Sequence, residues 1–506
     1  MNSKSAIILV LALGLSSCRI KTPTPWEEHG PLQLSSNDHY IEHVDGTPFL
    51  WIGGTAWGMF TRGNREDIKL YLDNRQSKGI NVIQAVVHWP VDAQGNGRLS
   101  GLSSGIGIKN PVNVYGHRPF NGGAINPDPT SPRVVSGGGP DNPNDYWDHA
   151  DFIVRELKKC GMYLAMVTVW APSFIDGEDN TEGIVYDTPA KSRSFGEFLG
   201  TRYKNEPNII WIVTGHTDPD NYNANINSRP IHRAMAEGIV KGVTGQTVGW
   251  NQTHDAWDQV LMTGHPAGPR SISDFFGGND VWLDFNMSQT GQQTNTLHLP
   301  YELTVSDYNL TNPVRPAVNG EGAYEGWAYW SEESIAYKSA LLARRTFYHT
   351  FFACGAGYTY GHEESCAKGC FDGIWGFCGI NNDGSWKKLL DSPAACDLFH
   401  LRELLENNEW WKWKHSQSSI LDGASSGATI KAAVMSSDSN RMLVYYPERN
   451  SATIRNDLER SAIATWFDPR NGNTIPAGSF SRGQTQALTP PSGWEDAVLI
   501  LKLAKF

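Results

Sequence analysis

The sequence predicts an α/β fold, a (β/α)8 barrel (TIM barrel) followed by a small C-terminal all-β sandwich domain. Strand-like and helix-like runs alternate over roughly 370 residues, and this order predicts parallel strands. About eight strand–helix pairs favour a closed barrel over an open sheet. From residue 413 onward, only short strands separated by turn residues remain, which is typical of a sandwich.

The elements of the predicted barrel follow one another in a regular order. The strands cover residues 49–52, 81–87, 163–169, 209–213, 259–263, 282–287, 316–318 and 351–358, and the helices cover residues 64–79, 145–159, 195–203, 231–240, 331–348 and 398–405. Asn64 is expected to cap the first helix and Gly79 to end it. A doubly wound sheet is the alternative, but Gly53-Gly54-Thr55-Ala56 does not match the G-x-G-x-x-G turn that it would need.

Composition excludes several classes of function. The chain has 506 residues and a net charge of −11 without a basic stripe, which argues against a nucleic-acid partner. Its 40% apolar content excludes a disordered chain. Nineteen Trp in an acidic chain are unusual. Most are expected in the core, but aromatic faces are also what carbohydrate sites use.

The first residues read as a targeting segment. Lys4 precedes an apolar run that is too short to span a bilayer and fits a signal peptide over residues 1–17. Leu15-Ser16-Ser17-Cys18 resembles a bacterial lipobox, which implies lipidation of Cys18; an ordinary signal peptide with a chance Cys is the alternative. Residues 18–35 are then a tether. We expect an exported lipoprotein, periplasm-facing or at the cell surface, that meets the membrane only through its anchor.

The chemistry of a barrel lies where its strands end. Glu321 ends the seventh strand, in Asn319-Gly320-Glu321-Gly322, and the two glycines leave room around it. Cleavage of a glycosidic bond needs two such groups, one that protonates the leaving oxygen and one that attacks the anomeric carbon or activates water. His216 and Asp218 follow the fourth strand, across the barrel mouth. In an extended segment they would point to the same side, so either could face Glu321.

A metal site and a cofactor are not expected. His362 with Cys366 and Cys370 could bind zinc, but an exported protein more often oxidises such cysteines. A local disulfide among Cys366, Cys370 and Cys378, with one thiol left over, is favoured. Residues 101–105 and 423–427 match G-x-S-x-G, but neither stretch joins a predicted strand to a predicted helix, so no nucleophile elbow is expected. No nucleotide-binding loop is found in the sequence either.

The chain resembles the apiosidase-like glycoside hydrolases, which are exported barrel enzymes with a small C-terminal β domain labelled collagen-binding. The matching stretches are residues 49–57, 78–85, 113–116, 202–211, 282–287, 319–321, 358–362 and 465–469. The resemblance implies a barrel over residues 36–412, a collagen-binding-like domain over residues 413–506, and cleavage of a glycosidic bond. The family's known activity is the release of apiose from a pectic polysaccharide. Its seventh-strand Glu, read as the nucleophile, matches Glu321.

The fourth-strand motif departs from the family. The family has Gly-Gly-Asp with Asp as acid/base, whereas this chain has Thr214, Gly215 and His216, with Asp218 two residues later. Three explanations are open: Asp218 has taken over the acid/base role, His216 donates the proton, or hydrolysis has been lost. Asp218 is favoured. Loss would leave a glycan-binding surface lipoprotein on a degenerate barrel. The substitution also makes a different sugar, in a pectin-like or algal side chain, an alternative to apiose.

Aromatic and polar residues near the strand ends are the expected sugar contacts. The predicted substrate-binding residues are Trp57, His88, Trp89, Trp170, Gln289, Glu325, Tyr358 and His362. Glu325 is expected either to orient the site or to bind a hydroxyl. The C-terminal domain could bind carbohydrate or cover one flank of the barrel, and the covering role is favoured.

Overall fold

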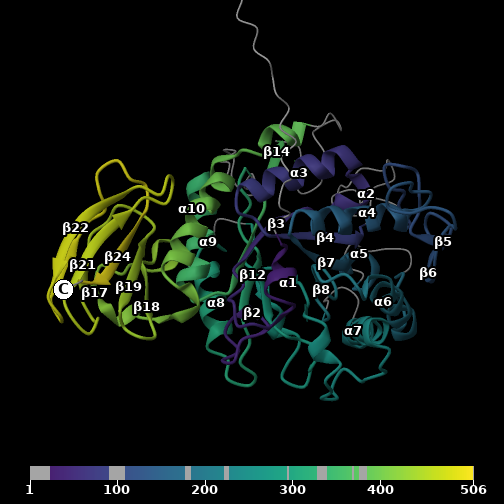
Figure 1. Ribbon diagram of the computed structural model, residues 1–506, viewed down its shortest axis with the longest axis horizontal. Coiled ribbons are helices and arrows are strands. Elements are labelled where there is room, and N and C mark those ends of the chain that lie inside the picture. Colours follow the sequence, from purple (N-terminus) through teal and green to yellow (C-terminus); the bar gives the residue numbers. More distant parts are fainter. Residues whose placement is uncertain are drawn as a thin grey trace, which may run out of the picture.

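A computed structural model shows a barrel with an all-β domain against one flank (Figure 1). It describes residues 23–89, 109–176, 184–220, 227–292, 296–326, 339–366, 370–374 and 385–504. The predicted signal peptide, Cys18, Ser331 and Cys378 lie outside these ranges. Residues 23–35, expected as tether, contain α1 (Pro25–Glu28) and β1 (Leu32–Leu34), which pairs with β2 (Ile41–His43). Trp26 packs edge-on against Tyr163, with ring centroids 5.3 Å apart, so this segment is attached to the barrel.

Eight parallel strands form the barrel, as predicted. They are β3 (Trp51–Thr55), β4 (Val82–His88), β7 (Tyr163–Val169), β8 (Ile209–Ile212), β9 (Met262–Thr263), β11 (Asn286–Gln289), β12 (Ala317–Glu321) and β13 (Gly357–Tyr360). Neighbours pair from β11 through β12, β13, β3, β4, β7 and β8 to β9. Asp284 N–H donates to Met262 O at 3.0 Å and Thr263 Oγ1 donates to Phe285 O at 2.6 Å, which links β9 to the segment leading into β11 and closes the circle.

Helices cover the outside of the barrel. They are α2 (Met59–Arg62), α3 (Arg65–Ser77), α4 (Tyr146–Lys159), α5 (Ala171–Phe174), α6 (Pro189–Tyr203), α7 (Arg229–Thr244), α8 (Leu299–Tyr308), α9 (Ala340–Phe352) and α10 (Pro393–Asn407). The Asn64 side chain accepts from Asp67 N–H and thus caps α3 as predicted. The Asp145 side chain accepts from Asp148 N–H in the same way and caps α4.

Some elements differ from the prediction. Phe351, predicted to begin the eighth strand, is in the last turn of α9, and β13 begins only at Gly357. Both environments bury it, and a short apolar run does not distinguish helix from strand. Besides the β1–β2 pair, three small strand pairs were not predicted: β5 (Phe120–Gly122) with β6 (Pro127–Pro132), β10 (Arg270–Ser271) with β11, and β14 (Glu363–Cys366) with β15 (Cys370–Gly373). The last hairpin sets Cys366 opposite Cys370 in its backbone register.

The C-terminal domain is a two-sheet antiparallel sandwich. One sheet contains β16 (Trp413–His415), β18 (Ala432–Ser436), β19 (Arg441–Tyr446), β24 (Ala497–Leu503), β21 (Ala462–Phe467) and β22 (Thr474–Phe480), and the other contains β17 (Ile420–Asp422), β20 (Ala452–Arg455) and β23 (Thr485–Leu488). The sheets enclose their own apolar core.

The larger sheet also packs against α9 of the barrel. Tyr445 of β19 stacks on Tyr348 of α9, with centroids 4.8 Å apart. Arg344 of α9 is 2% exposed and pairs with Asp397, Glu495 and Asp496. The hydrophobic core of the barrel continues into this sheet. This continuity supports the covering role favoured for the domain.

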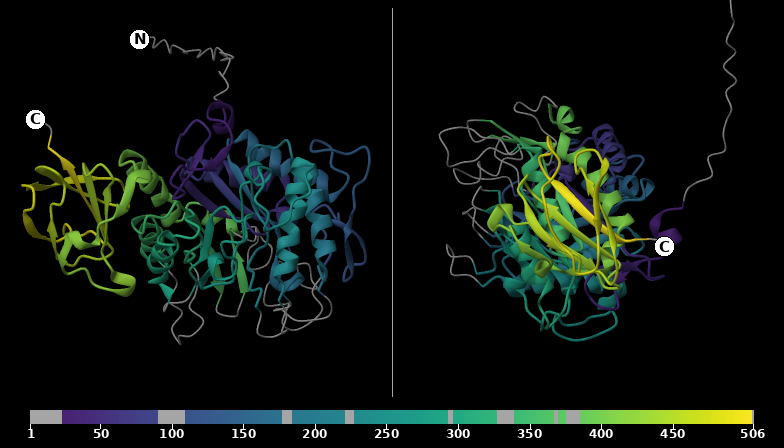
Figure 2. Two further views of the ribbon diagram at one scale, coloured as in Figure 1. Left: turned by 90° about the horizontal axis from the view of Figure 1, so that it is seen from below. Right: turned by 90° about the vertical axis from the view of Figure 1, so that its left-hand side faces the viewer.

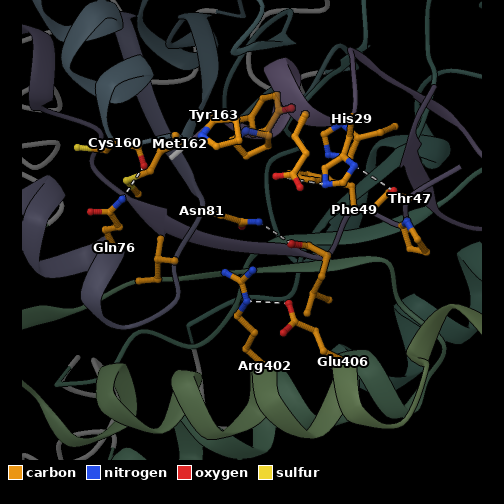
Figure 3. A pocket seen from close by; sticks show the side chains of 18 of the residues that line it. His29, Thr47, Phe49, Gln76, Asn81, Cys160, Met162, Tyr163, Arg402 and Glu406 are labelled. Atoms are coloured by element: carbon orange, nitrogen blue, oxygen red, sulfur yellow. Dashed lines mark hydrogen bonds and ion pairs between the residues drawn. The ribbon is translucent and has the colours of Figure 1, made fainter. Parts of the chain in front are cut away.

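The two ends of the barrel differ. The first described residues lie at the end where the strands begin (Figure 2), since Pro23 lines one recess with Leu50, Asn81 and Met162, which precede β3, β4 and β7. At the N-terminal end lies a recess of about 390 Å³, where Arg402 and Glu406 of α10 lie opposite Tyr163, with Phe49 and Asn81 between them (Figure 3). Polar side chains that line this recess form hydrogen bonds within the protein: Asn81 Nδ2 donates to Leu50 O at 2.8 Å, and Arg402 Nε donates to Glu406 Oε1 at 2.8 Å. This end of a barrel usually serves stability.

Candidate active site

Glu321 is the last residue of β12, and its carboxylate reaches the mouth of the barrel from a buried position. Its side chain is 7% exposed. The glycines beside it are required by close packing. A Cβ on Gly320 would lie 2.5 Å from the Met287 sulfur, and one on Gly322 would lie 2.5 Å from Thr346 and 2.6 Å from Tyr358.

A histidine faces this carboxylate. His265 Nε2 lies 3.3 Å from Glu321 Oε2. His265 Nδ1 accepts from the backbone N–H of His216 at 3.3 Å, so in the neutral ring the proton is on Nε2, toward Glu321. Burial by itself would raise the pKa of Glu321, but His265, His216 and the Tyr324 hydroxyl together outweigh it and lower that pKa below its usual value. Glu321 is therefore ionised at neutral pH.

Two further residues hold the other side of Glu321. Gln292 Nε2 donates to Glu321 Oε1 at 3.3 Å and to Gly322 O at 2.7 Å, and its Oε1 accepts from Tyr324 N–H at 2.8 Å. The Tyr324 hydroxyl also receives Trp57 Nε1–H at 3.0 Å. These contacts restrict the carboxylate to one orientation.

An aromatic wall surrounds the carboxylate and its histidine. Trp57 packs against Trp170 and His265, with centroids 5.6 Å and 5.4 Å away. Trp89 lies 4.8 Å from Trp170. His216 also stacks on Trp170, with ring centroids 5.1 Å apart and 23° between the ring planes. Three predicted sugar contacts, Trp57, Trp89 and Trp170, thus meet in one cluster, and all three are buried.

His216 lies in this cluster with an unusual backbone. Its φ is 51°, in the left-handed region. Burial lowers the pKa of His216 to about 4, while the charges of Glu321 and Asp176 raise it and His265 lowers it further. At neutral pH its ring is therefore uncharged. His216 and Glu321 share a neighbour, because the His216 N–H donates to His265 Nδ1 and His265 Nε2 lies 3.3 Å from Glu321 Oε2.

Asp218 lies in a different environment. Its Oδ1 accepts from Asp220 N–H at 3.2 Å, within its own turn, and its charge acts on Arg229. The expectation that His216 and Asp218 point to one side assumed an extended chain. Because β8 ends at Ile212 and His216 is left-handed, strand alternation does not extend through this segment.

The remaining predicted contacts are enclosed by protein. His88 is fully buried, with Nδ1 3.0 Å from Tyr186 Oη and Nε2 2.7 Å from Lys109 O, and burial lowers its pKa to about 4. Glu325 accepts from the Tyr360 hydroxyl at 2.6 Å and from Ala394 N–H, in the first turn of α10, at 3.3 Å.

Burial raises the pKa of Glu325 and lowers that of its neighbour His362 to about 4. Gln289 and Tyr358 are also buried. Direct sugar contact by these residues stays a prediction.

Comparison with known proteins decides the family. The apiosidase-like catalytic domain matches residues 35–412, and the domain described as "Putative collagen-binding domain of a collagenase" matches residues 416–502. The chain belongs to the apiosidase-like glycoside hydrolases. No curated protein matches it.

Solved structures share the fold of this apiosidase-like chain. A glycoside hydrolase family 5 protein from Bacteroides vulgatus is 24% identical, with a TM-score of 0.75 and coverage of 95% of both chains. A protein titled glycoside hydrolase is also 24% identical, with a TM-score of 0.74 and coverage of 95% of this chain and 98% of its own. At such identities the likeness establishes the fold alone.

The apiosidase-like site uses side chains that sequence reasoning did not select. His265 lies two residues after the end of β9, a position from which it could have been selected, whereas Gln292 and Tyr324 carry no signal of their own. Among the described residues, no group of three or more His, Cys, Asp and Glu is arranged to hold a metal ion. In the same part of the chain, no helix combines the length and the apolar character needed to cross a membrane.

Proposed function

We propose that this glycoside hydrolase cleaves a side-chain glycosidic bond in a pectin-like or algal polysaccharide, with Glu321 as nucleophile and His216 as proton donor. The observation that carries the proposal is the ionised Glu321 held by His265, Gln292 and Tyr324 inside an aromatic wall. Such a wall suits the apolar face of a sugar ring, and a fixed carboxylate suits attack on an anomeric carbon.

The reaction would proceed in two steps. Glu321 forms a bond to the anomeric carbon while the glycosidic C–O bond breaks, and the leaving oxygen takes a proton from protonated His216. Water then attacks the glycosyl–enzyme ester and returns its proton to the His216 ring, which frees Glu321. A donor whose pKa is about 4 is protonated mainly in acid, so activity is expected to fall as pH rises above about 5.

The experiment compares sugar release from branched pectic and algal oligosaccharides by the wild type and two variants. His216→Gln is expected to lose about 10²-fold or more in kcat/KM, the typical contribution of general acid catalysis. Asp218→Asn is expected to stay near wild type, since its carboxylate serves its own turn. The reverse order would overturn the assignment and restore Asp218 as the donor.

A binding protein on a degenerate barrel is the second candidate. The uncharged His216 ring in place of the family's Asp favours it. Wild-type protein that binds these oligosaccharides between pH 4 and 7 without releasing sugar would establish it.

A lipid anchor at Cys18 completes the proposal. The first described residue, Pro23, lines the recess at the end of the barrel opposite Glu321, so an anchor there would leave the mouth facing away from the membrane. Wild-type protein expressed in a bacterium should partition into detergent, whereas Cys18→Ser should stay in the aqueous phase. Equal partitioning of the two would contradict the anchor.

A further inference from the structure

A buried carboxylate–imidazole pair lies behind the segment that carries His216. Asp176 follows α5, and His232 lies in α7. Both side chains are fully buried, and Asp176 Oδ1 lies 3.2 Å from His232 Nε2. Neither group takes part in the proposed reaction.

Four hydrogen bonds join the pair to the segment 214–218. Thr214 Oγ1 lies 2.8 Å from His232 Nδ1. The Thr217 hydroxyl donates to Asp176 Oδ2 at 3.1 Å, so its oxygen is left to accept from His232 Nε2–H, 2.9 Å away. Asp218 N–H donates to the same Oδ2 at 3.0 Å. The Ser228 hydroxyl donates to Oδ1 and fixes the carboxylate from the start of α7.

These contacts decide which way His216 turns. Thr214 and Thr217, on either side of Gly215 and His216, both direct their side chains toward α7. Two backbone hydrogen bonds fix the chain between them: Gly215 N–H donates to Val169 O at 2.9 Å, and Thr217 N–H donates to His265 O at 3.0 Å. With both ends fixed, the chain passes through the left-handed conformation at His216, which is unfavourable for a non-glycine residue. The ring then lies on the mouth side, against Trp170.

We propose that Asp176 and His232 are positioning residues of the glycosidase site, which hold Thr214 and Thr217 toward α7 so that the ring of His216 is presented to Glu321. This inference rests on the proposed role of His216.

The charge of Asp176 gives the pair a second effect. Three charged or titratable groups act on His216: Glu321 from β12 and Asp176 raise its pKa, and His265 lowers it, against the larger lowering by burial. Removal of the Asp176 charge should therefore lower the pKa of His216 further. A purely structural role would not move this pKa.

The test uses full-length protein labelled with ¹³C at histidine Cε1, and His216→Gln identifies the His216 signal. In the wild type, stacking on Trp170 should shift this signal upfield, and its titration gives the pKa. Asp176→Asn should move the signal toward that of an unstacked histidine, lower its pKa, and reduce kcat/KM about 10²-fold, as expected for a misplaced catalytic group. Thr217→Val, which keeps the Asp176 charge but removes both hydrogen bonds of the Thr217 hydroxyl, should move the signal while changing the pKa of His216 less.

Asp220→Asn is the matched control, because this acid lies in the same segment but pairs with Arg229 at the surface. It should leave the signal and kcat/KM unchanged. If Asp176→Asn and Thr217→Val lower only the melting temperature and leave the His216 signal and pKa as in the wild type, the pair is structural and the proposal is wrong. If the signal moves as expected but the wild type releases no sugar, the positioning stands and the proposed function fails.

Discussion

Arg344 ties the two domains together, and its replacement by methionine should weaken this junction strongly. Its Nη1 lies 2.7 Å from Asp397 Oδ2, and its Nη2 lies 2.9 Å from Asp496 Oδ1. The side chains of Arg344, Asp397 and Asp496 are 2%, 7% and 0% exposed. Arg344→Met would leave two buried carboxylates without their cation, which typically costs about 3–5 kcal/mol.

The assay is thermal unfolding, monitored by fluorescence at several pH values. For a chain of this size, about 1–2 °C is lost per kcal/mol, so the melting temperature should fall by about 3–10 °C at pH 7.5. Burial already raises the pKa of Asp397 to about 6 and raises that of Asp496. Without Arg344 both rise further, so protonation should relieve the loss near pH 5, and the difference from the wild type should widen as the pH rises.

Arg345→Met is the matched control, since the Nε of Arg345 donates to Pro447 O at 2.8 Å and the described structure gives it no carboxylate partner. It should cost about 1 kcal/mol, the usual value of one hydrogen bond. Equal losses for the two variants, or a loss at Arg344 that does not depend on pH, would refute the reasoning.

Three further predictions follow from named contacts. His265→Leu should raise the pKa of Glu321, because burial would act with less opposition; the acidic limb of the kcat/KM profile should move to higher pH, and kcat/KM should fall about 10–100-fold. Burial lowers the pKa of His88, His149 and His349 to about 4; each therefore stabilises the fold above its unfolded pKa near 6.5 and loses this contribution, up to about 1.4 kcal/mol per pH unit, as the pH falls toward 4. An unfolding midpoint in denaturant that is equal at pH 7.5 and pH 5 would contradict this. Asn64→Ala should cost about 1 kcal/mol in the same assay through loss of the α3 cap.

Local patterns predicted much of the barrel. Asn64 marked a helix start because capping depends on residues only three positions apart. Glu321 could be selected because parallel strands bring their carboxyl ends to one mouth. Phe351 was misassigned because burial in a helix and burial in a strand leave the same apolar signature over a few residues.

The partners of Glu321 could not be predicted in the same way. Gln292 and Tyr324 reach it from loops, and their contacts exist only once the barrel is closed. The choice between His216 and Asp218 depended on one backbone angle. A left-handed residue after the end of β8 interrupts strand alternation, and a histidine at that position gives no sign of it.

The most direct test of the account is the turnover of Glu321→Gln on an oligosaccharide that the wild type cleaves. The amide keeps the size of the side chain but removes the attacking charge, so kcat/KM should fall at least about 10³-fold. Glu302→Gln, on the exposed side of α8, should turn over as the wild type does. Full activity in Glu321→Gln would contradict the assignment of this carboxylate as the nucleophile.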